Sequence, residues 1–347
     1  MWNCGDDFIA FGVSNLIRNA ADFPINFIAY NRAPELHQLR ISSLKFKHND
    51  QEISLNLKQF NNTVLWALNN SWSPDLDLSL IDYVIFAGTP EWLGSMVEPL
   101  NSAIIRSETA VPWSYLGVGV FEKIVKLKFS ELSRLDQLML KGADYISVRD
   151  QKAQSLLEPV QSDVLPCPAL FASKTTQQRR SKKKLALCGQ GMHRRQKIDP
   201  KTFEFTVRFF KRLIDHYDCT LVCHYIDDLY ALRHLNIPAL YSYDAKDYLE
   251  IYKQFDLNIT TRVHGAGLCA SLGVPSIVVK HSERSGTVQG FKSCTIEPSL
   301  EKIDEYMDMV ASFNVSQKSE DLIEHKNKYQ AVYIDKIKQK ILPSFKP

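Results

Sequence analysis

The sequence of 347 residues lacks the features that mark membrane-spanning, secreted and metal-binding proteins. No apolar run approaches the ~18 residues of a membrane-spanning helix. The first residues hold no basic segment followed by an apolar core, so we expect no signal peptide. No CxxC pair of the metal-binding type occurs, and the seven cysteines lie mostly inside apolar runs. We therefore expect buried reduced thiols, no metal site and a cytoplasmic protein.

The chain also lacks a strong excess of one charge and a nucleotide-binding loop. Its 42 Lys+Arg and 39 Asp+Glu give a formal net charge of +3, too small to indicate a nucleic-acid partner. Gly117-Val118-Gly119 lacks the third glycine of the dinucleotide motif, and we predict no cofactor. With 45% hydrophobic and 23% charged residues the composition is globular, and the length favours two domains.

Segments with the period of a strand alternate with segments of helical period along both halves, which predicts a doubly wound α/β fold. We expect strands at residues 25–30, 83–87, 113–120, 185–188, 220–223, 239–243, 257–260 and 276–279, and a turn followed by a strand within residues 142–150. We expect helices at residues 7–20, 129–141, 151–157, 201–216, 229–235, 247–253, 300–313 and 320–341. In the segment 201–216, for example, Phe205, Phe209 and Leu213 recur at i, i+4 and i+8.

Residues 174–184 are polar and basic and hold no large apolar side chain, which predicts an interdomain linker. The predicted domains are then residues 1–173 and 185–318, with residues 319–347 forming a helix that packs back across the first domain. The linker is either a solvated loop or a surface attracted to anionic lipid head groups or a phosphorylated acceptor. Peripheral contact with the inner face of a membrane therefore stays open, as does the oligomeric state.

The most informative stretch is 256–280, where a short strand is followed by Arg262 and His264 and then by a small, apolar helix. Gly273 and Pro275 are a helix-stop signal. Loops after the carboxyl ends of parallel strands bind ligands, and residues two apart in extended backbone point to the same side. The N–H groups near Gly265 and Ala266, at the helix N-terminus, favour an anion. We predict a site for a phosphorylated or carboxylated substrate; the alternative is a salt bridge of Arg262 and a helix cap by His264.

Further candidates follow other predicted strands. His224 and Asp228 come after the strand 220–223, and either could activate a hydroxyl as a base, although Asp227 and Asp228 could instead cap the next helix. Arg149, with Asp150, forms either an edge of the site or a structural salt bridge. Arg284 lies in a glycine-containing loop and either adds positive charge to the site or faces solvent.

The start of the chain also holds candidate site residues, because Asn3, Gly5 and Asp6 stand where a loop meets the first predicted helix. That position suits contact with a substrate, and helix capping by Asp6 is the alternative.

Taken in order, these motifs resemble the polysaccharide pyruvyl transferase family. The matching pieces are Asn3-x-Gly5-Asp6, Ala143-Asp144-Tyr145-Ile146-Ser147-Val148-Arg149-Asp150, Cys167-Pro168-Ala169, residues 224–228, Arg262-Val263-His264-Gly265 and Leu272-Gly273-Val274-Pro275. The similarity covers roughly residues 1–300. The loop after the strand 83–87, which begins Gly88-Thr89-Pro90, departs from the pattern because it lacks the glycine run that many members have.

The resemblance implies two Rossmann-like domains in a GT-B-like arrangement, with the active-site cleft between them. The first domain would bind the acceptor and the second the donor. It implies transfer of the pyruvyl group of phosphoenolpyruvate to two hydroxyls of a sugar, which gives a cyclic ketal on a cell-surface glycan or its lipid-linked precursor. The acceptor could be free, nucleotide-linked or lipid-linked. Arg262 would hold the phosphate or carboxylate as a bidentate partner, and His264 would transfer a proton.

Two other functions compete with this interpretation. A glycosyltransferase of the same architecture would bind a nucleotide sugar in its second domain. A non-catalytic carbohydrate-binding or scaffold protein would keep its function when Arg262 or His264 is replaced by alanine. Arg262, His264 and Asn3-x-Gly5-Asp6 occur together, which disfavours the scaffold, since such a protein has no physical need for all of them.

Overall fold

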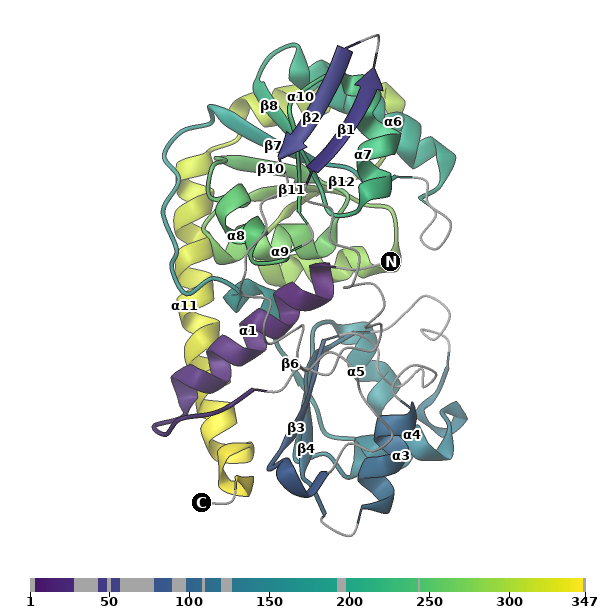
Figure 1. Cartoon of the computed structure of the whole chain (residues 1–347), viewed down its shortest axis with the longest axis vertical. Helices are drawn as coiled ribbons and strands as arrows, with labels where there is room; N and C mark the ends of the chain where they lie inside the picture. Colours follow the sequence, from purple (N-terminus) through teal and green to yellow (C-terminus); the bar gives the residue numbers. More distant parts are fainter. Residues whose placement is uncertain are drawn as a thin grey trace.

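The computed structural model describes residues 4–27, 43–48, 51–56, 78–88, 98–107, 110–119, 127–191, 198–242 and 244–345. Within these residues, each half of the chain forms a parallel sheet with helices around it, and Figure 1 shows one sheet above the other. The predicted α/β class is therefore confirmed.

The strands of the described chain are β1 (Ser43–His48), β2 (Gln51–Asn56), β3 (Val84–Ala87), β4 (Trp113–Val118), β5 (Tyr145–Val148), β6 (Asp163–Val164), β7 (Lys184–Cys188), β8 (Asp218–Cys223), β9 (Ala239–Tyr241), β10 (Leu257–Thr260), β11 (Ser276–Val279) and β12 (Cys294–Ile296). The α-helices are α1 (Cys4–Ala20), α3 (Glu98–Arg106), α4 (Arg134–Lys141), α5 (Gln151–Leu157), α6 (Pro200–Ile214), α7 (Ile226–Leu232), α8 (Asp247–Tyr252), α9 (Val263–Ser271), α10 (Ile303–Ser312) and α11 (Val315–Lys340). The 3₁₀ helices used below are η5 (Pro168–Phe171) and η7 (Glu283–Phe291).

The larger sheet has the strand order β12-β11-β10-β7-β8-β9, and every neighbouring pair is parallel. The strands β10 and β11 are buried along their whole length, as expected for apolar, partly β-branched segments covered on both faces. The chain extends from β7 through β8 and β9, then returns to the other side of β7 with β10. At such a reversal the carboxyl ends of the strands form the usual ligand site of an open α/β sheet.

The smaller sheet has the order β3-β4-β5-β6 and is also parallel. The helices α3, α4 and α5 lie beside it (Figure 1). The ends of β4 and β5 are neighbours, because the Arg149 N–H donates to the Val118 carbonyl at 3.0 Å. Gly119 and Arg149 therefore leave this sheet at the same edge.

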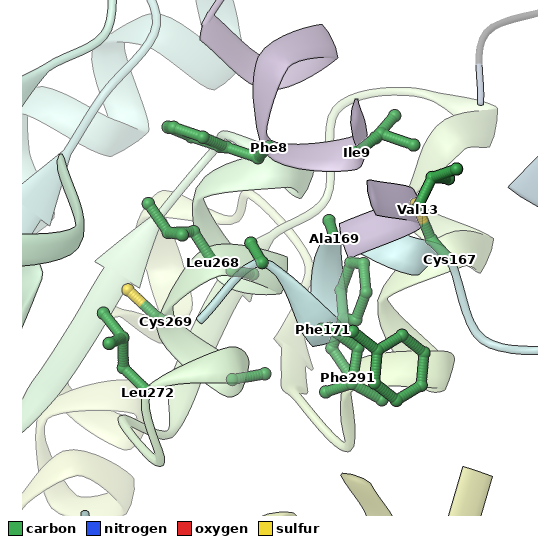
Figure 2. Packing of buried hydrophobic residues seen from close by; sticks show 14 of the residues in the cluster. Phe8, Ile9, Val13, Cys167, Ala169, Phe171, Leu268, Cys269, Leu272 and Phe291 are labelled. Carbon is green, nitrogen blue, oxygen red and sulfur yellow. The ribbon is translucent and has the colours of Figure 1, made fainter. Parts of the chain in front are cut away.

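The helix α1 lies between the two halves in Figure 1 and joins their cores. Figure 2 shows Phe8 and Val13 of α1 in one apolar cluster with Leu268 of α9. A Cβ atom on Gly12 would lie 1.7 Å from the carbonyl oxygen of Pro168, so α1 approaches η5 at a distance that only glycine permits. The N-terminus of α1 is thereby fixed close to α9.

The long helix α11 begins at Val315, five residues before the predicted start, because the side chain of Asn314 caps it and accepts from the Gln317 N–H at 3.1 Å. It runs along both halves of the molecule (Figure 1). Tyr333 Oη donates to the Pro166 carbonyl at 2.9 Å, which anchors the C-terminal half of α11 to the end of the first half of the chain.

A buried lysine joins α11 to the segment 173–176 and to α9. Lys326 Nζ donates to the carbonyl oxygens of Ser173 (2.9 Å) and Ser271 (2.7 Å) and to Thr176 Oγ1 (2.7 Å). Its ammonium thus satisfies the C-terminus of α9, where the helix dipole is negative. Burial lowers the pKa of Lys326 to about 8.

The segment predicted as a linker packs on the second half. Arg179 Nη1 donates to the Lys253 carbonyl at 2.9 Å, and Lys182 Nζ donates to the Ala311 carbonyl at 2.6 Å. Both carbonyls lie at the C-terminal ends of helices, where cations are favourable. The structure does not decide the domain boundaries at 173 and 185, which stay predictions.

The strands β1 and β2 form an antiparallel hairpin that our sequence analysis did not predict. His48 lies opposite Gln51 in its register. The sequence holds a signal for it, since Asn49-Asp50 is typical of a turn.

Candidate active site

The candidate residues follow the carboxyl ends of neighbouring strands in both sheets. In the larger sheet Thr260 of β10 pairs with Cys188 of β7, so Arg262 and Gly191 leave the sheet together at the reversal of strand order. In the smaller sheet Gly119 and Arg149 leave together. The two edges meet, because Arg149 Nη1 lies 3.3 Å from His264 Nε2.

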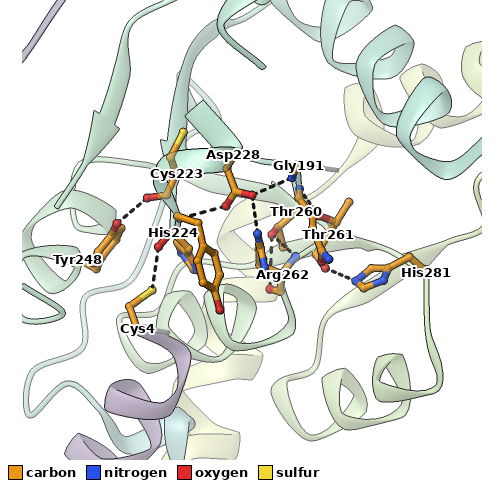
Figure 3. A network of polar contacts seen from close by, with 12 residues as sticks. Cys4, Gly191, Cys223, His224, Asp228, Tyr248, Thr260, Thr261, Arg262 and His281 are labelled. Atoms are coloured by element: carbon orange, nitrogen blue, oxygen red, sulfur yellow. Dashed lines mark hydrogen bonds and ion pairs between the residues drawn. The ribbon is translucent and has the colours of Figure 1, made fainter. Parts of the chain in front are cut away.

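Arg262 is buried in a polar network that Figure 3 shows. Its Nη2 lies 2.5 Å from Asp228 Oδ1, and its guanidinium carbon lies 4.5 Å from the centre of the Tyr225 ring. Burial lowers the pKa of Arg262, but the Asp228 carboxylate and the Tyr225 phenol outweigh it, so the net shift is upward. The arginine is therefore charged and already has an anionic partner inside the protein.

Asp228 is fully buried, and both of its carboxylate oxygens accept hydrogen bonds. Oδ1 accepts from the Gly191 N–H at 2.8 Å besides Arg262, and Oδ2 accepts from the Tyr225 N–H at 3.2 Å. The bond from Tyr225 caps the first turn of α7. This environment favours a structural role over proton transfer to a sugar hydroxyl, and the predicted catalytic role of Asp228 stays untested.

His224 is 2% exposed, and its ring Nε2 lies 2.8 Å from Tyr252 Oη. Burial, and then the charge of Arg262, lower its pKa to about 3, so the ring is neutral. Phe8 and Tyr248 pack edge-on against it, with ring centroids 5.7 Å and 5.1 Å away. His224 thus supports the network rather than facing a substrate in this arrangement, and its predicted catalytic role also stays untested.

Arg262 and His264 have different partners because α9 begins between them. Arg262 has extended φ and ψ of −96° and 109°, and Val263 is the first helical residue. The expected extended backbone, with both side chains on one side, therefore does not hold. His264 lies in the first turn of α9 and is half-buried.

The N-terminus of α1 packs directly on this imidazole. A Cβ atom on Gly5 would lie 2.4 Å from His264 Nδ1, so the absence of a side chain at Gly5 allows the contact. Gly265 has the same effect on the other side of α9, where a Cβ would lie 2.9 Å from His224 Cε1. Both glycines admit histidine rings, and their predicted substrate contacts stay predictions.

Arg149 differs from Arg262 in having no carboxylate partner among the residues that the structure describes. It is 5% exposed, and its Nε makes no hydrogen bond within that part of the chain. The neighbouring Asp150, which sequence analysis offered as its ion-pair partner, instead caps α5 by accepting from the Ala153 N–H at 2.9 Å. Burial raises the pKa of the Cys167 thiol, and the charge of Arg149 opposes this shift without cancelling it. The guanidinium therefore also lies near that sulfur.

Three more predicted residues are less well defined. The Ala266 N–H donates to the Arg262 carbonyl at 3.1 Å within α9, which disfavours it as a donor to a ligand. Asp6 is half-buried near Tyr225, whose pKa is raised by burial and, more weakly, by this carboxylate. Asn3 and the side chain of Arg284 lie outside the described residues.

Sequence reasoning missed Tyr225, Tyr252 and Gly119, which contact the candidate residues. Tyr225 follows His224 directly, so its neighbourhood was visible, but nothing local placed its ring under Arg262. In the described residues no group of three or more His, Cys, Asp and Glu is arranged to hold a metal. No helix in that same part of the chain is long and apolar enough to cross a membrane.

Comparison with solved structures shows similarity to UDP-N-acetylglucosamine 2-epimerases. One such crystal structure matches with a TM-score of 0.55 and 13% identity, over 96% of this chain and 92% of that one. The enzyme from Methanocaldococcus jannaschii matches with a TM-score of 0.50 and 13% identity, over 92% of this chain and 96% of that one. The enzyme from Neisseria meningitidis, bound to UDP-GlcNAc, matches with a TM-score of 0.50 and 11% identity over 76% of each chain. At such identities the likeness concerns the fold alone, and the predicted GT-B-like arrangement is confirmed.

A search of curated proteins gave no match. A family model described as polysaccharide pyruvyl transferase matches residues 3–283. The match spans both sheets up to the loop after β11, and it includes Arg149, Arg262 and His264.

Proposed function

The chain belongs to the polysaccharide pyruvyl transferase family, and on that premise we propose that it transfers the pyruvyl group of phosphoenolpyruvate to two hydroxyls of a sugar. The product is a cyclic ketal in a cell-surface polysaccharide or its lipid-linked precursor. One observation carries the proposal: the buried Arg149 guanidinium lies 3.3 Å from His264, and no carboxylate among the described residues pairs with it.

A buried cation without an anionic partner is costly, and such groups are usually completed by a ligand or an ion. Phosphoenolpyruvate offers a carboxylate and a phosphate, both of which arginine binds through two parallel hydrogen bonds. The N-termini of α1 and α9 meet at His264, and each adds the positive end of a helix dipole. Arg149 therefore binds the donor, whereas Arg262 is already paired with Asp228.

The reaction moves two protons and exchanges one C–O bond for two. Carbon C3 of the donor gains a proton, which leaves cationic character at C2. One sugar hydroxyl attacks C2, the bond from C2 to the phosphate oxygen breaks, and the second hydroxyl closes the ring. Of the two hydroxyl protons, one replaces the proton delivered to C3 and the other leaves with phosphate, so no oxidant or reductant is needed.

His264 carries the proton in this scheme. A guanidinium has donors only, so the contact from Arg149 Nη1 makes His264 Nε2 the acceptor and places the ring proton on Nδ1. When the donor anion engages Arg149, Nε2 becomes available to take a hydroxyl proton. Imidazole suits both directions of transfer near neutral pH.

The acceptor is a sugar that is presented to the first domain, and a lipid-linked form agrees with a cytoplasmic enzyme at the inner face of the membrane. The exposed cations Lys174, Arg180 and Lys183 of the segment 174–184 would face anionic head groups. Arg179 and Lys182 of the same segment bond to helix ends, so only part of its charge is available.

Calorimetric titration with phosphoenolpyruvate tests the donor site. We expect saturable binding to the wild type, and binding at least about 30-fold weaker in Arg149→Met, since losing one partner of a buried charge pair costs roughly 2–5 kcal/mol. Arg208→Met is the matched control, because Arg208 lies on α6 in an exposed pair with Glu204. It should leave the affinity unchanged.

The same titration with UDP, GDP and CMP sugars distinguishes the competing function. Binding of a nucleotide sugar without binding of phosphoenolpyruvate would replace the proposal by a glycosyltransferase. Phosphoenolpyruvate binding that survives Arg149→Met would place the donor elsewhere in the molecule.

A further inference from the structure

Two glycines stand at the end of β4, Gly117 within it and Gly119 directly after it, and the structure gives them separate tasks. Gly117 has φ of +70°, and a Cβ there would lie 2.0 Å from Pro168 Cδ, so this glycine serves the backbone and the packing of η5. Gly119 has no positive φ. Position 119 requires glycine only because a side chain would not fit. A Cβ there would lie 2.2 Å from Nε of Arg149 and 2.5 Å from its Cζ and Nη2.

The space that Gly119 leaves is filled by the side chain on which the proposed donor site depends. The Arg149 guanidinium covers the Gly119 backbone and reaches across to α9, with Nη1 3.3 Å from His264 Nε2. An alanine at position 119 would force the guanidinium to move by roughly 1 Å to regain ordinary van der Waals distance. A shift of that size within a catalytic array can reduce rates about 100-fold.

We propose that Gly119 is a positioning residue that admits the Arg149 guanidinium to the site and, through it, fixes the ring proton of His264 on Nδ1. This inference rests on the proposed function for its effect on the donor, but its effect on His264 does not need a ligand. Gly119 contacts neither the donor nor the acceptor; it acts through Arg149.

The test compares wild type, Gly119→Ala, Arg149→Met and the double variant by ¹⁵N NMR of the imidazole nitrogens. The signal of His264 is assigned by its loss in His264→Gln. We expect an Nδ1–H tautomer in the wild type and loss of that preference in Gly119→Ala. The double variant should equal Arg149→Met, because a residue that acts only through Arg149 has no further effect once Arg149 is gone.

Gly142→Ala is the control for a crowded glycine away from the site. A Cβ there would lie 2.7 Å from Trp113 Cζ2, so it disturbs packing without touching Arg149. It should lower thermal stability and leave the His264 tautomer unchanged. If Gly119→Ala behaves like Gly142→Ala, with a wild-type tautomer, Gly119 is a packing residue and the inference is overturned.

Phosphoenolpyruvate titration of Gly119→Ala separates this inference from the proposed function. We expect a dissociation constant about 10–100-fold above that of the wild type. If the wild type binds no phosphoenolpyruvate but Gly119→Ala still alters the tautomer, the proposed function fails and the positioning role stands. If the wild type binds phosphoenolpyruvate, and Gly119→Ala binds it equally well with an unchanged His264 tautomer, the proposed function stands and the positioning role of Gly119 fails.

Discussion

Two buried arginines lie near two histidines at the contact between the halves of this molecule, and their environments are opposite. Arg262, near His224, has Asp228 at 2.5 Å and the Tyr225 ring beneath it. Arg149, beside His264, has no carboxylate partner among the described residues, whereas the Nε atoms of both arginines lack a hydrogen bond there. Their exposures, 7% and 5%, are nearly equal, so burial alone does not separate them.

The difference shows that a motif and a site need not coincide. Arg262-Val263-His264 is the strongest motif in the sequence, yet its arginine completes an internal ion pair. Of the two arginines, the one without a carboxylate partner among the described residues comes from the other sheet, 115 residues before His264. Arg262 already has its counter-ion inside the protein, whereas a buried arginine without a carboxylate partner is available to an anionic ligand.

Replacing each arginine by methionine tests this comparison most strongly. Arg262→Met leaves Asp228 buried without its cation, which costs about 3–5 kcal/mol in the free energy of unfolding. Arg149→Met removes an uncompensated charge and should leave that free energy unchanged or raise it. Urea unfolding at neutral pH measures both, and equal losses in the two variants would show that Arg149 also has a stabilising partner.

The two histidines allow a second test, through pH. The pKa of His224 is lowered to about 3 in the folded protein, chiefly by burial, from an ordinary value near 6.5. Between these values the unfolded chain binds a proton that the folded protein does not, so His224 makes stability fall as the pH drops. The stability is fully present above about pH 6.5 and declines by at most about 1.4 kcal/mol per pH unit below it.

His224→Gln should remove this part of the acid slope. Urea unfolding at pH 7, 6 and 5 gives the slope, and His216→Gln, at an exposed position on the surface, is the control. Parallel curves for wild type and His224→Gln would mean that His224 is not held neutral, and it would then return as a candidate base.

The sequence predicted the parts of this comparison that depend on local pattern. The strand β10, the helix start after it and the position of Arg262 at a strand end follow from periodicity and from glycine and proline signals. The partner of each arginine does not follow, because Asp228 and Tyr225 reach Arg262, and Arg149 reaches His264, only through the packing of separate elements. The same limit hid Gly119, whose role is to leave space for a side chain from another strand.

Lys326 offers a case between the two arginines, since it is buried and fully hydrogen-bonded but its three acceptors are neutral. Lys326→Met removes the cost of burying a charge but leaves the Ser173 and Ser271 carbonyls without their donor. We expect a loss of about 1–3 kcal/mol at pH 7. With a folded pKa of about 8 against 10.5 unfolded, the wild type should gain stability relative to the variant from pH 8 to 10. Urea unfolding of both proteins across that range checks the sign, and an increasing advantage of the variant would contradict it.

Tyr252→Phe is the smallest change that separates a supporting from a catalytic His224. It removes the hydroxyl 2.8 Å from His224 Nε2 and keeps the ring, so the free energy of unfolding should fall by about 1 kcal/mol. If His224 only supports α9, the dependence of turnover on pH keeps its wild-type shape, because the proton that moves belongs to His264. A pH–rate profile displaced in Tyr252→Phe would instead assign proton transfer to His224. The buried contacts of His224 would then belong to the reacting site.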